Sequence, residues 1–497
     1  MIHVCILSFC IGFLSLCMEI LWVRLFGFTN HSIPQAFAWV LVFYLLGIAF
    51  GALFGRMFCN DRYDLWRVSG LSLLSAGSFN IIGPLLYVQC AGSPQQVPLG
   101  AAIVFLTAFL AAIIFPIAHH LSSPYIQNDC GKKISRVYVS NILGATIGPL
   151  VTSLLLLAYF TTQQIFLLCA VLTIGVGIFC LFQQKLAVVF YSSLAVLVAL
   201  FMFCFNIKPH YIVAKAADPV APIRHVVENQ YGIIMTFAGG QAGDYIFGGN
   251  VYDGRTNLDP IINSNQINRL IILAALQEKP KKVLMIGLSV GTWLKLITSF
   301  PGIEAIDVLE INPGYLQVIK DYPQQWSALQ DPRVNLIFDD GRRWLLHHPQ
   351  NTYDLIIMNT TFHWRAYSTN LLSKNYLELV QRHMTPTAIL GFNSTSSPDV
   401  LQTANSVFSY AYLYENFVIA SNFDWRQKLQ NPQASAILAN LMLDGKPLFP
   451  PHSENVITGF LNKPTVSLKE VAARTPRPLE VITDSNLITE YKYGRWL

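Results

Sequence analysis

Four groups of glycine or polar residues each follow a short apolar run in the second half of the chain, and together they could bind a nucleoside. The glycines of Gly287–Gly291 permit a tight turn and let backbone N–H groups approach a ligand at a helix N-terminus. Glu310 is placed to accept hydrogen bonds from both hydroxyls of a ribose. Asp339-Asp340-Gly341 and Asn359-Thr360-Thr361 complete the set. Each group alone is also typical of an ordinary loop cap, but four in register favour a nucleoside site.

The apolar runs predict the strands that would position these groups. Residues 283–286 are typical of a buried parallel strand, and residues 292–298, after the glycine loop, are typical of a helix. Further strands are expected at 305–309, 334–338 and 353–358. This pattern predicts an α/β, Rossmann-like parallel sheet, in which ligands bind beyond the carboxyl ends of the strands.

The composition divides the chain into two chemically different parts. Residues 1–205 hold eight Lys/Arg and four Asp/Glu, whereas residues 206–497 hold 25 and 24. The whole chain is 53% hydrophobic and only 12% charged, against about 25% charged for a soluble domain. These values exclude one uniform soluble domain, a disordered chain and a small disulfide scaffold. The net charge of +5, without a long basic run, does not suggest a nucleic-acid partner.

We expect residues 1–205 to form a multi-span α-helical membrane domain of about seven helices. Apolar segments of the ~20 residues that a span needs lie near 2–26, 34–58, 69–90, 98–118, 137–160, 163–182 and 186–205. Gly47, Gly51 and Gly55 form a stripe that lets another helix approach closely, and Arg24 should find a polar partner or an interfacial position. The nine cysteines lie here without metal-ligand spacing, so we predict no metal site.

The charges between the spans predict an orientation. With seven spans, the N-terminal side collects most of the Lys/Arg of this half (Arg56, Arg62, Arg67, Lys132, Lys133, Arg136 and Lys185). The positive-inside rule then places the N-terminus in the cytoplasm and suggests that the polar half lies outside, although its side stays open. We expect an integral protein of a bacterial inner membrane, with the lipid bilayer as its first partner.

The polar half divides further. Residues 206–225 are proline-containing and typical of a linker, and the alternating pattern of 226–265 predicts a small β-domain. Tyr252-Asp253-Gly254 in it is typical of a plain hairpin turn. Residues 266–420 form the Rossmann-like domain, and residues 421–497 are a C-terminal extension without an assigned role.

Several sequence strings in this half resemble the spermidine synthase family. They are VLMIGLSVG at 283–291, VLEINP at 308–313, DPRVNLIFDDG at 331–341, YDLIIMNTT at 353–361 and LSKNYLEL at 372–379. The likeness covers roughly residues 225–420. The strings SLCMEILWVRLFG at 15–27 and VSNILGATIG at 139–148 resemble the membrane domain that is fused to some of these proteins. The chain is thus similar to the membrane-fused, polyamine aminopropyltransferase-like members.

The resemblance implies a class I methyltransferase-type fold with a small N-terminal β-domain. It also implies a site for decarboxylated S-adenosylmethionine or S-adenosylmethionine. By position, Gly287, Ser289 and Gly291 would form the cofactor loop, and Glu310 would hold the ribose. Asp340, with Gly341 beside it, would hold the adenine.

The acids that the family uses on its amine substrate are replaced in this chain. In aminopropyl transfer the amine must lose a proton before it attacks, and a dicationic substrate needs acids around it. The position of the family's catalytic aspartate holds Asn359, whose amide cannot act as a general base. A second aspartate falls on Phe362, and an acidic segment falls near Asn263-Ser264-Asn265. Aminopropylation of putrescine by the usual mechanism is therefore disfavoured.

Residues 359–365 offer other chemistry at the same place. His363 is a titratable base candidate, and Arg365 would attract an anion or a carboxylate. With Asn359, they are the candidate catalytic residues. The alternative, that the segment is a structural lid, is equally well supported.

Three functions remain open on the sequence. The first is a membrane-anchored, S-adenosyl-nucleotide-dependent transferase, of aminopropyl- or methyltransferase type, that acts on a small amine or amino-acid-like acceptor. The second is a catalytically degenerate domain that serves as a scaffold or accessory subunit among other membrane subunits or in a homo-oligomer. The expected outside location favours the second, because S-adenosyl nucleotides are not ordinarily available there. A solute transporter is the third.

Overall fold

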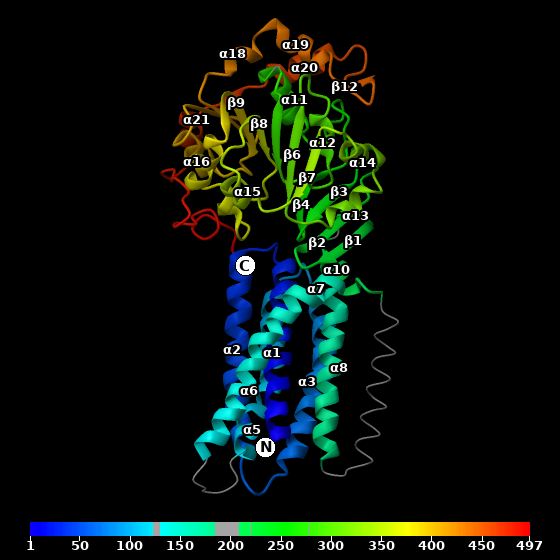
Figure 1. Cartoon of the computed structure of the whole chain (residues 1–497), viewed down its shortest axis with the longest axis vertical. Coiled ribbons are helices and arrows are strands. Elements are labelled where there is room, and N and C mark those ends of the chain that lie inside the picture. Colours follow the sequence, from blue (N-terminus) through cyan, green and yellow to red (C-terminus); the bar gives the residue numbers. More distant parts are fainter. Residues whose placement is uncertain (123–129, 184–207, 219, 278) are drawn as a thin grey trace. The chain divides into compact units, whose positions relative to one another are not determined.

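The computed structural model describes residues 1–122, 130–183, 208–218, 220–277 and 279–497, which form two compact units (Figure 1). The first unit holds residues 1–219 together with the turn at 228–233. The second holds residues 220–227 and 234–496.

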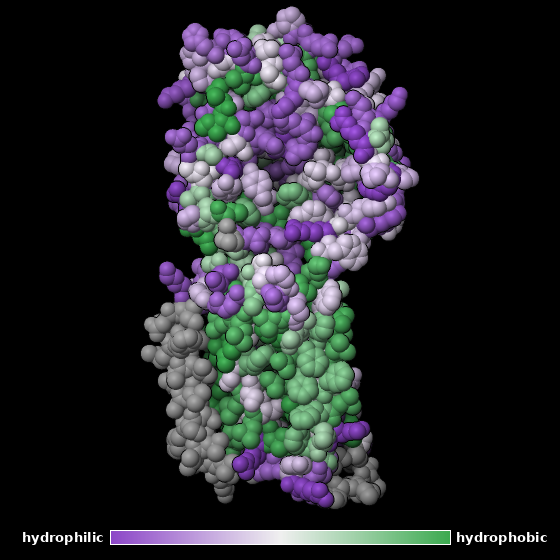
Figure 2. Space-filling view, turned by 180° about the vertical axis from the view of Figure 1, so that it is seen from behind, coloured by the Kyte–Doolittle hydropathy of each residue, from purple (hydrophilic) through white to green (hydrophobic). Residues whose placement is uncertain are grey.

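The first unit is a helical bundle. Its elements are α1 (Ile2–Thr29), α2 (Pro34–Gly55), η1 (Arg56–Phe58), α3 (Leu65–Gln89), α4 (Gln96–Ala112), α5 (Ile114–Ser122), α6 (Cys130–Val151), the π-helical η2 (Thr152–Leu156), α7 (Leu157–Tyr159), α8 (Thr162–Phe182) and α10 (Tyr211–Ala216). Six helical stretches in the described residues are long and apolar enough to cross a membrane. They confirm six of the expected segments as helices, and the seventh, near 186–205, lies outside the described residues. On the face that Figure 2 shows, hydrophobic side chains cover most of the length of this unit and hydrophilic ones gather at its two ends, as contact with hydrocarbon would require.

The glycine stripe of α2 packs directly on α4. A Cβ atom at Gly47 or Gly51 would meet the carbonyl oxygen of Phe105 or Phe109 in α4, and one at Gly55 would meet that of Ile113. The absence of side chains on this stripe therefore permits a backbone-to-backbone approach of the kind that small residues allow between membrane helices.

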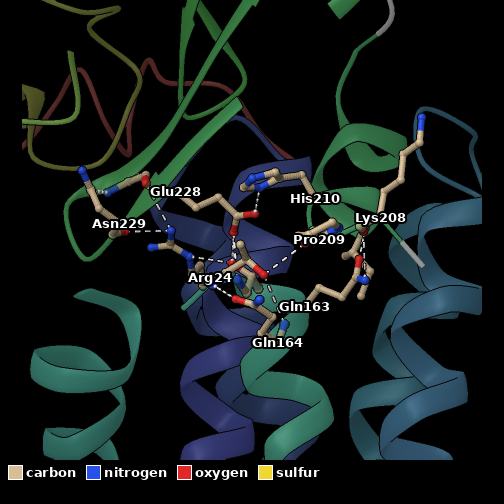
Figure 3. Close-up of polar contacts among 12 residues, drawn as sticks. Arg24, Gln163, Gln164, Lys208, Pro209, His210, Glu228 and Asn229 are labelled. Carbon is tan, nitrogen blue, oxygen red and sulfur yellow. Dashed lines mark hydrogen bonds and ion pairs between the residues drawn. The ribbon is translucent and has the colours of Figure 1, made fainter. Parts of the chain in front are cut away.

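Arg24 finds its partners within the same unit, at the turn that joins the first two β-strands (Figure 3). Its Nη2 donates to the main-chain oxygens of Asn229 (2.8 Å) and Gly232 (3.1 Å), and its Nε donates to Thr162 Oγ1 (3.0 Å). Thr162 in turn donates its N–H (2.9 Å) and its hydroxyl (2.5 Å) to Glu228. Burial raises the pKa of Glu228, but hydrogen bonds from His210 and Thr162 outweigh burial and hold this pKa below its usual value. The charge of Arg24 is thus satisfied by a built polar cluster.

The second unit begins with a small antiparallel sheet of strand order β1-β2-β3-β4. Its elements are β1 (Ile223–Asn229), β2 (Gly232–Phe237), η3 (Gly240–Ala242), β3 (Tyr245–Gly248) and β4 (Val251–Arg255). Helix α11 (Asn268–Leu276) follows and leads into the main sheet.

The main sheet has eight strands in the order β14-β10-β11-β9-β8-β5-β6-β7. The strands are β5 (Lys282–Ile286), β6 (Ala305–Glu310), β7 (Val334–Phe338), β8 (Tyr353–Met358), β9 (Met384–Asn393), β10 (Tyr410–Tyr414), β11 (Phe417–Ser421) and β14 (Thr465–Val466). Strands β5 to β9 pair in parallel, whereas β11 joins β9 antiparallel. The chain runs from β5 outward through β6 and β7, then returns to place β8 on the other side of β5. That reversal is a topological switch point, where α/β sheets bind ligands beyond the carboxyl ends of the strands.

Helices cover both faces of this sheet, which explains why its central strands are continuous apolar runs. Val283 and Met285 face one core, and the alternate residues Leu284 and Ile286 face the other. The remaining elements are α12 (Thr292–Ile297), α13 (Tyr315–Ile319), α14 (Pro323–Leu329), α15 (Gly341–His347), η4 (Ser368–Leu371), α16 (Lys374–Arg382) and α17 (Pro398–Asn405).

The C-terminal residues are part of this fold. They contain α18 (Arg426–Leu429), α19 (Pro432–Ala439), a two-stranded ribbon of β12 (Met442–Leu443) and β13 (Lys446–Pro447), α20 (Glu454–Leu461) and α21 (Leu468–Arg474). Leu438 and Ile457 join one core of the sheet, and Ile482 joins the other. The extension thus packs on both faces and adds β14 to the sheet edge.

The close contact of α2 with α4 can be tested by one added methyl group. We expect Gly51→Ala to cost about 1–3 kcal/mol, as overpacking does, because the new Cβ would meet the carbonyl oxygen of Phe109. The melting temperature of the detergent-purified protein should fall. Gly27→Ala in α1 is the matched control, since a Cβ there meets nothing within 4 Å. Equal melting temperatures for the two variants would contradict the packing role.

Candidate functional site

The loop between β5 and α12 has an unusual backbone that brings it close to the end of β8. Gly287 (φ +87°), Ser289 (φ +50°) and Gly291 (φ +81°) all adopt positive φ angles. A Cβ atom at Gly287 would lie 2.8 Å from the carbonyl oxygen of Asn359. Glycine at 287 therefore permits the two loops at the switch point to touch.

The buried carboxylate of Glu310 ties this loop to the end of β6. Its Oε2 accepts the N–H groups of Leu288 (2.8 Å) and Ser289 (3.3 Å), and its Oε1 accepts that of Asn312 (2.8 Å). Burial raises the pKa of Glu310 to about 7, and the charge of Asp253 adds to the rise while the hydrogen bonds oppose it. A carboxylate has about four lone-pair sites, so Glu310 keeps room for a further donor.

Asp253 lies in β4, the last strand of the small sheet, and is a second carboxyl group beside the glycine loop. Tyr315 donates its hydroxyl to Asp253 Oδ2 (2.8 Å). Burial raises the pKa of Asp253, whereas hydrogen bonds from Ser289 and Tyr315 and the charge of Arg365 lower it. The interpretation of Tyr252-Asp253-Gly254 as a plain hairpin turn is wrong, because all three residues lie in strand β4. Folding brings Asp253 to the glycine loop.

Asp340 and Gly341 begin helix α15 beside the end of β7. Asp340 accepts the N–H of Arg343 (2.8 Å) and thereby caps the helix. A Cβ atom at Gly341 would lie 2.8 Å from the side chain of Ile286, so glycine lets α15 start close to β5. Ile311, directly after Glu310, is 56% exposed and offers an apolar surface at the same edge.

A cavity of about 260 Å³ lies at the carboxyl ends of β8 and β9. Residues of β4, β9, α11, α12 and four loops line it: Tyr252, Asp253, Gly254, Ser264, Asn265, Gln266, Arg269, Trp293, Asn359, Thr360, Thr361, Phe362, Asn393, Thr395, Ser396 and Asn416. Among these described residues, Asp253 is the only carboxylate and Arg269 the only cation. Asp253, Trp293 and Asn359 also line a smaller cavity against Leu288 and Ser289 of the glycine loop.

The structure separates the three candidate catalytic residues. Asn359 lines the cavity, and its Oδ1 accepts a hydrogen bond from Asn393 (3.2 Å). His363 and Arg365 are not among the described residues that line it. His363 Nδ1 lies 3.0 Å from the carbonyl oxygen of Thr395, so that nitrogen carries a proton, and burial lowers the pKa of this ring. Arg365 donates to Thr361 Oγ1 (2.8 Å).

The C-terminal extension fixes the loop that carries these residues. Glu490 is buried and accepts the N–H groups of Tyr367 (3.0 Å) and Thr369 (2.9 Å). Trp364 stacks on Phe362 with ring centroids 5.3 Å apart, and Arg495 lies over the Trp364 ring. The loop after β8 is therefore a packed segment of the cavity wall.

The site combines a glycine loop, a buried carboxylate and two adjoining cavities at a switch point. In the described residues no group of His, Cys, Asp or Glu side chains could hold a metal ion. Such an arrangement defines a nucleotide-type α/β fold with a place for a second, small ligand.

Comparison with known proteins agrees with this class. Residues 269–412 match the spermine/spermidine synthase domain. The chain is 36% identical over 107 residues to a polyamine aminopropyltransferase of Alkaliphilus oremlandii, which covers 21% of this chain and 37% of that protein. It is 34% identical over 114 residues to spermidine synthase 2 of Arabidopsis thaliana, which covers 23% and 33%.

A crystal structure of spermidine synthase in complex with the transition-state analogue AdoDATO is also similar. It shares 16% identity, covers 49% of this chain and 86% of that one, and gives a TM-score of 0.40. The matched segments span about a third of the length of each of the two sequence relatives. The resemblance to the spermidine synthase-like family is confirmed, and this chain carries a spermidine synthase-like domain.

The pKa of Glu310 gives the fold a pH dependence that can be measured. Its folded value of about 7 exceeds the unfolded value of ~4.3, so the folded state binds this proton more tightly. The resulting stabilisation is complete below the unfolded pKa and is lost as the pH rises through about 7. Between pH 5.5 and pH 8 the wild type should lose about 2 kcal/mol that Glu310→Gln does not lose.

The measurement is the apparent melting temperature of both proteins at the two pH values. The change with pH is measured for each protein, and subtracting one change from the other removes the contribution of the groups that titrate alike in both. Glu304→Gln, at a 64% exposed side chain paired with Lys281, is the surface control. The same pH dependence in the wild type and in Glu310→Gln would refute the role of Glu310.

Proposed function

We propose that this chain is a membrane-anchored transferase that uses an S-adenosyl-type nucleotide, either decarboxylated S-adenosylmethionine or S-adenosylmethionine, on a small acceptor. One observation carries the proposal. The cavity of about 260 Å³ shares Asp253, Trp293 and Asn359 with the smaller cavity at the glycine loop. Space for an acceptor thus adjoins the loop that would hold the nucleotide.

The residues at the strand ends fit a nucleoside. Glu310 would accept a ribose hydroxyl, since its carboxylate retains acceptor capacity beside three backbone donors. The exposed side chain of Ile311 would pack on a base, and Asp340 would accept from its amino group. Gly287, Ser289 and Gly291 would bring backbone N–H groups to the rest of the nucleotide.

The bound nucleotide would supply an alkyl carbon attached to a positively charged sulfur. As the acceptor nitrogen bonds to that carbon, the carbon–sulfur bond breaks with its electron pair on sulfur, and the nitrogen must release a proton. Asp253 is the carboxylate placed to take this proton. Its raised pKa makes its ionised form a better base.

The three candidate catalytic residues take supporting roles in this proposal. Asn359 would hydrogen-bond the acceptor without changing its protonation, because an amide neither gains nor loses a proton. Arg365 would hold Asp253 ionised through its nearby charge. His363, bonded to Thr395, would position the loop after β8.

A catalytically degenerate scaffold is the second candidate, favoured by Asn359 at the position of the family's catalytic acid. Solute transport has less support. The helical unit holds a cavity of about 230 Å³ between α3, α8 and α10, and the described residues that line it carry no charge. A polyamine cation would find no counter-charge there.

Nucleotide binding separates the first two candidates. We expect S-adenosylmethionine or its decarboxylated form to raise the melting temperature of the full-length protein in detergent. Glu310→Ala should abolish that shift, because it removes the ribose acceptor. Glu304→Ala, on the exposed surface, should retain it. The absence of a shift with either nucleotide in the wild type would contradict the transferase and leave the scaffold.

The orientation of the polar half relative to the membrane also bears on the choice between a transferase and a scaffold. The positive-inside rule predicts that the polar half lies outside. A phosphatase fused after residue 497 should then be active in a bacterial host, whereas a fluorescent protein that matures only in the cytoplasm should stay dark. The opposite pattern would overturn the predicted orientation and remove the main objection to catalysis, since S-adenosyl nucleotides are cytoplasmic.

A further inference from the structure

Arg269 is a buried cation that faces the acceptor cavity. It stands in the first turn of α11, is only 7% exposed and is one of the cavity's lining residues. Its Nε donates to the main-chain oxygen of Gln266 (3.0 Å). Its Nη1 donates to Asn393 Oδ1 (3.0 Å) and Asn416 Oδ1 (2.6 Å). Within the described residues, its Nη2 has no protein acceptor, so two N–H donors remain for a ligand.

No carboxylate accepts a hydrogen bond from this guanidinium in the part of the chain that the structure describes. Its three protein acceptors are neutral oxygens, and it forms no ion pair there. Glu415, the acid whose charge acts most on it, is itself paired with Lys463. The faces of Trp293 and Phe417 lie 5.6 and 5.9 Å from its central carbon and stabilise the cation in part. Burial lowers the pKa of Arg269 to about 10, so it stays charged at neutral pH.

A buried charge without a counter-ion is costly, and a ligand of opposite charge removes that cost. A planar guanidinium with two unused donors suits a carboxylate, which can accept both at once. We infer that the acceptor of the proposed transfer carries a carboxylate, which Arg269 binds inside the cavity. This inference deepens the proposed function and rests on it.

The charges of the cavity are arranged for an amino acid rather than a diamine. Asp253 lines both this cavity and the smaller one at the glycine loop, whereas Arg269 lines only the larger one. An acceptor with its carboxylate on Arg269 can therefore direct its amino group toward Asp253 and the nucleotide. A dicationic polyamine would place one of its ammonium groups close to Arg269, which repels it. The amide side chains at that end of the cavity are neutral and would not offset the repulsion.

Arg365 is the competing arginine for an anion at this site, and its surroundings differ from those of Arg269. Burial lowers the pKa of Arg365, but the nearby carboxylate of Asp253 opposes this effect, so Arg365 already has an acid in its field. It also lies outside the lining of the cavity. The sequence predicts the anion site at Arg365, and we assign it to Arg269 instead.

Matched ligands of the same chain length test the inference on the full-length protein in detergent. Isothermal titration would compare 4-aminobutyrate with putrescine, which differ in carrying a carboxylate or a second ammonium group. Formate, acetate and glycine serve as smaller carboxylate probes. We expect 4-aminobutyrate to bind roughly 10- to 100-fold more tightly than putrescine, the range for a hydrogen bond to a charged group.

Two variants remove the charge in different ways. Arg269→Met deletes the guanidinium, and Asn416→Asp keeps the side-chain size but gives Arg269 an internal counter-ion at the 2.6 Å contact. Each should lower the affinity for 4-aminobutyrate by roughly 10-fold or more. Lys281→Met, which removes a cation from a 68% exposed surface side chain, should leave the preference for the carboxylate unchanged. If Arg269→Met does not fold, Asn416→Asp carries the test alone.

Nucleotide binding, titrated separately, keeps the two proposals apart. Carboxylate binding that depends on Arg269 without any nucleotide binding would keep the anion site and refute the transferase. Nucleotide binding without affinity for any carboxylate probe would refute the inference alone. A preference for putrescine, or carboxylate binding that survives both variants, would also overturn it.

Discussion

The carboxylate of Glu310 is the interaction on which the candidate site depends. Parallel strands end with backbone N–H groups that have no partner in the sheet, and a buried N–H without a partner is unfavourable. Glu310 accepts three of them, from Leu288, Ser289 and Asn312. It thereby holds the glycine loop, including the positive φ of Ser289, against the end of β6. A group that binds a ribose in related folds is thus also the group that fixes the backbone around the ligand, so binding and loop geometry share one side chain.

Glu310 and Asp253 lie toward the glycine loop, whereas Arg269 lines only the larger cavity. Asp253 raises the pKa of Glu310, and Arg365 and Tyr315 offset the charge of Asp253. In the described residues, Arg269 donates hydrogen bonds only to amide and carbonyl oxygens. Because such charges act at short range in a low-dielectric cavity, the two regions would orient any ligand that carries both signs. The replacement of the family's acids by amides does not explain this distribution of charge, because amides alone would leave the cavity neutral.

The sheet was predictable because each central strand is buried on both faces, and a strand of that kind is a continuous apolar run. The expected strands at 283–286, 305–309, 334–338 and 353–358 agree with β5 to β8 to within one residue at either end. The glycine loop and Glu310 followed from their positions after those strands. Asp253 and Arg269 were not predicted, because the small sheet and the first turn of α11 reach the cavity only through tertiary packing. Strand β14 was missed as well, since two residues carry no periodicity that a sequence can reveal.

The free-energy cost of burying polar and charged groups also distinguishes the transferase from the scaffold. A scaffold derived from an enzyme can lose catalytic acids to neutral amides such as Asn359 without a penalty, because the amides satisfy one another, as Asn393 and Asn359 do. A buried arginine that faces an open cavity and donates only to neutral oxygens is different, since burying its charge costs free energy in the unliganded protein. A folded domain has only about 5–15 kcal/mol of stability to set against such a cost. The presence of Arg269 therefore argues that the cavity binds an anion, which a purely structural domain has no need to do.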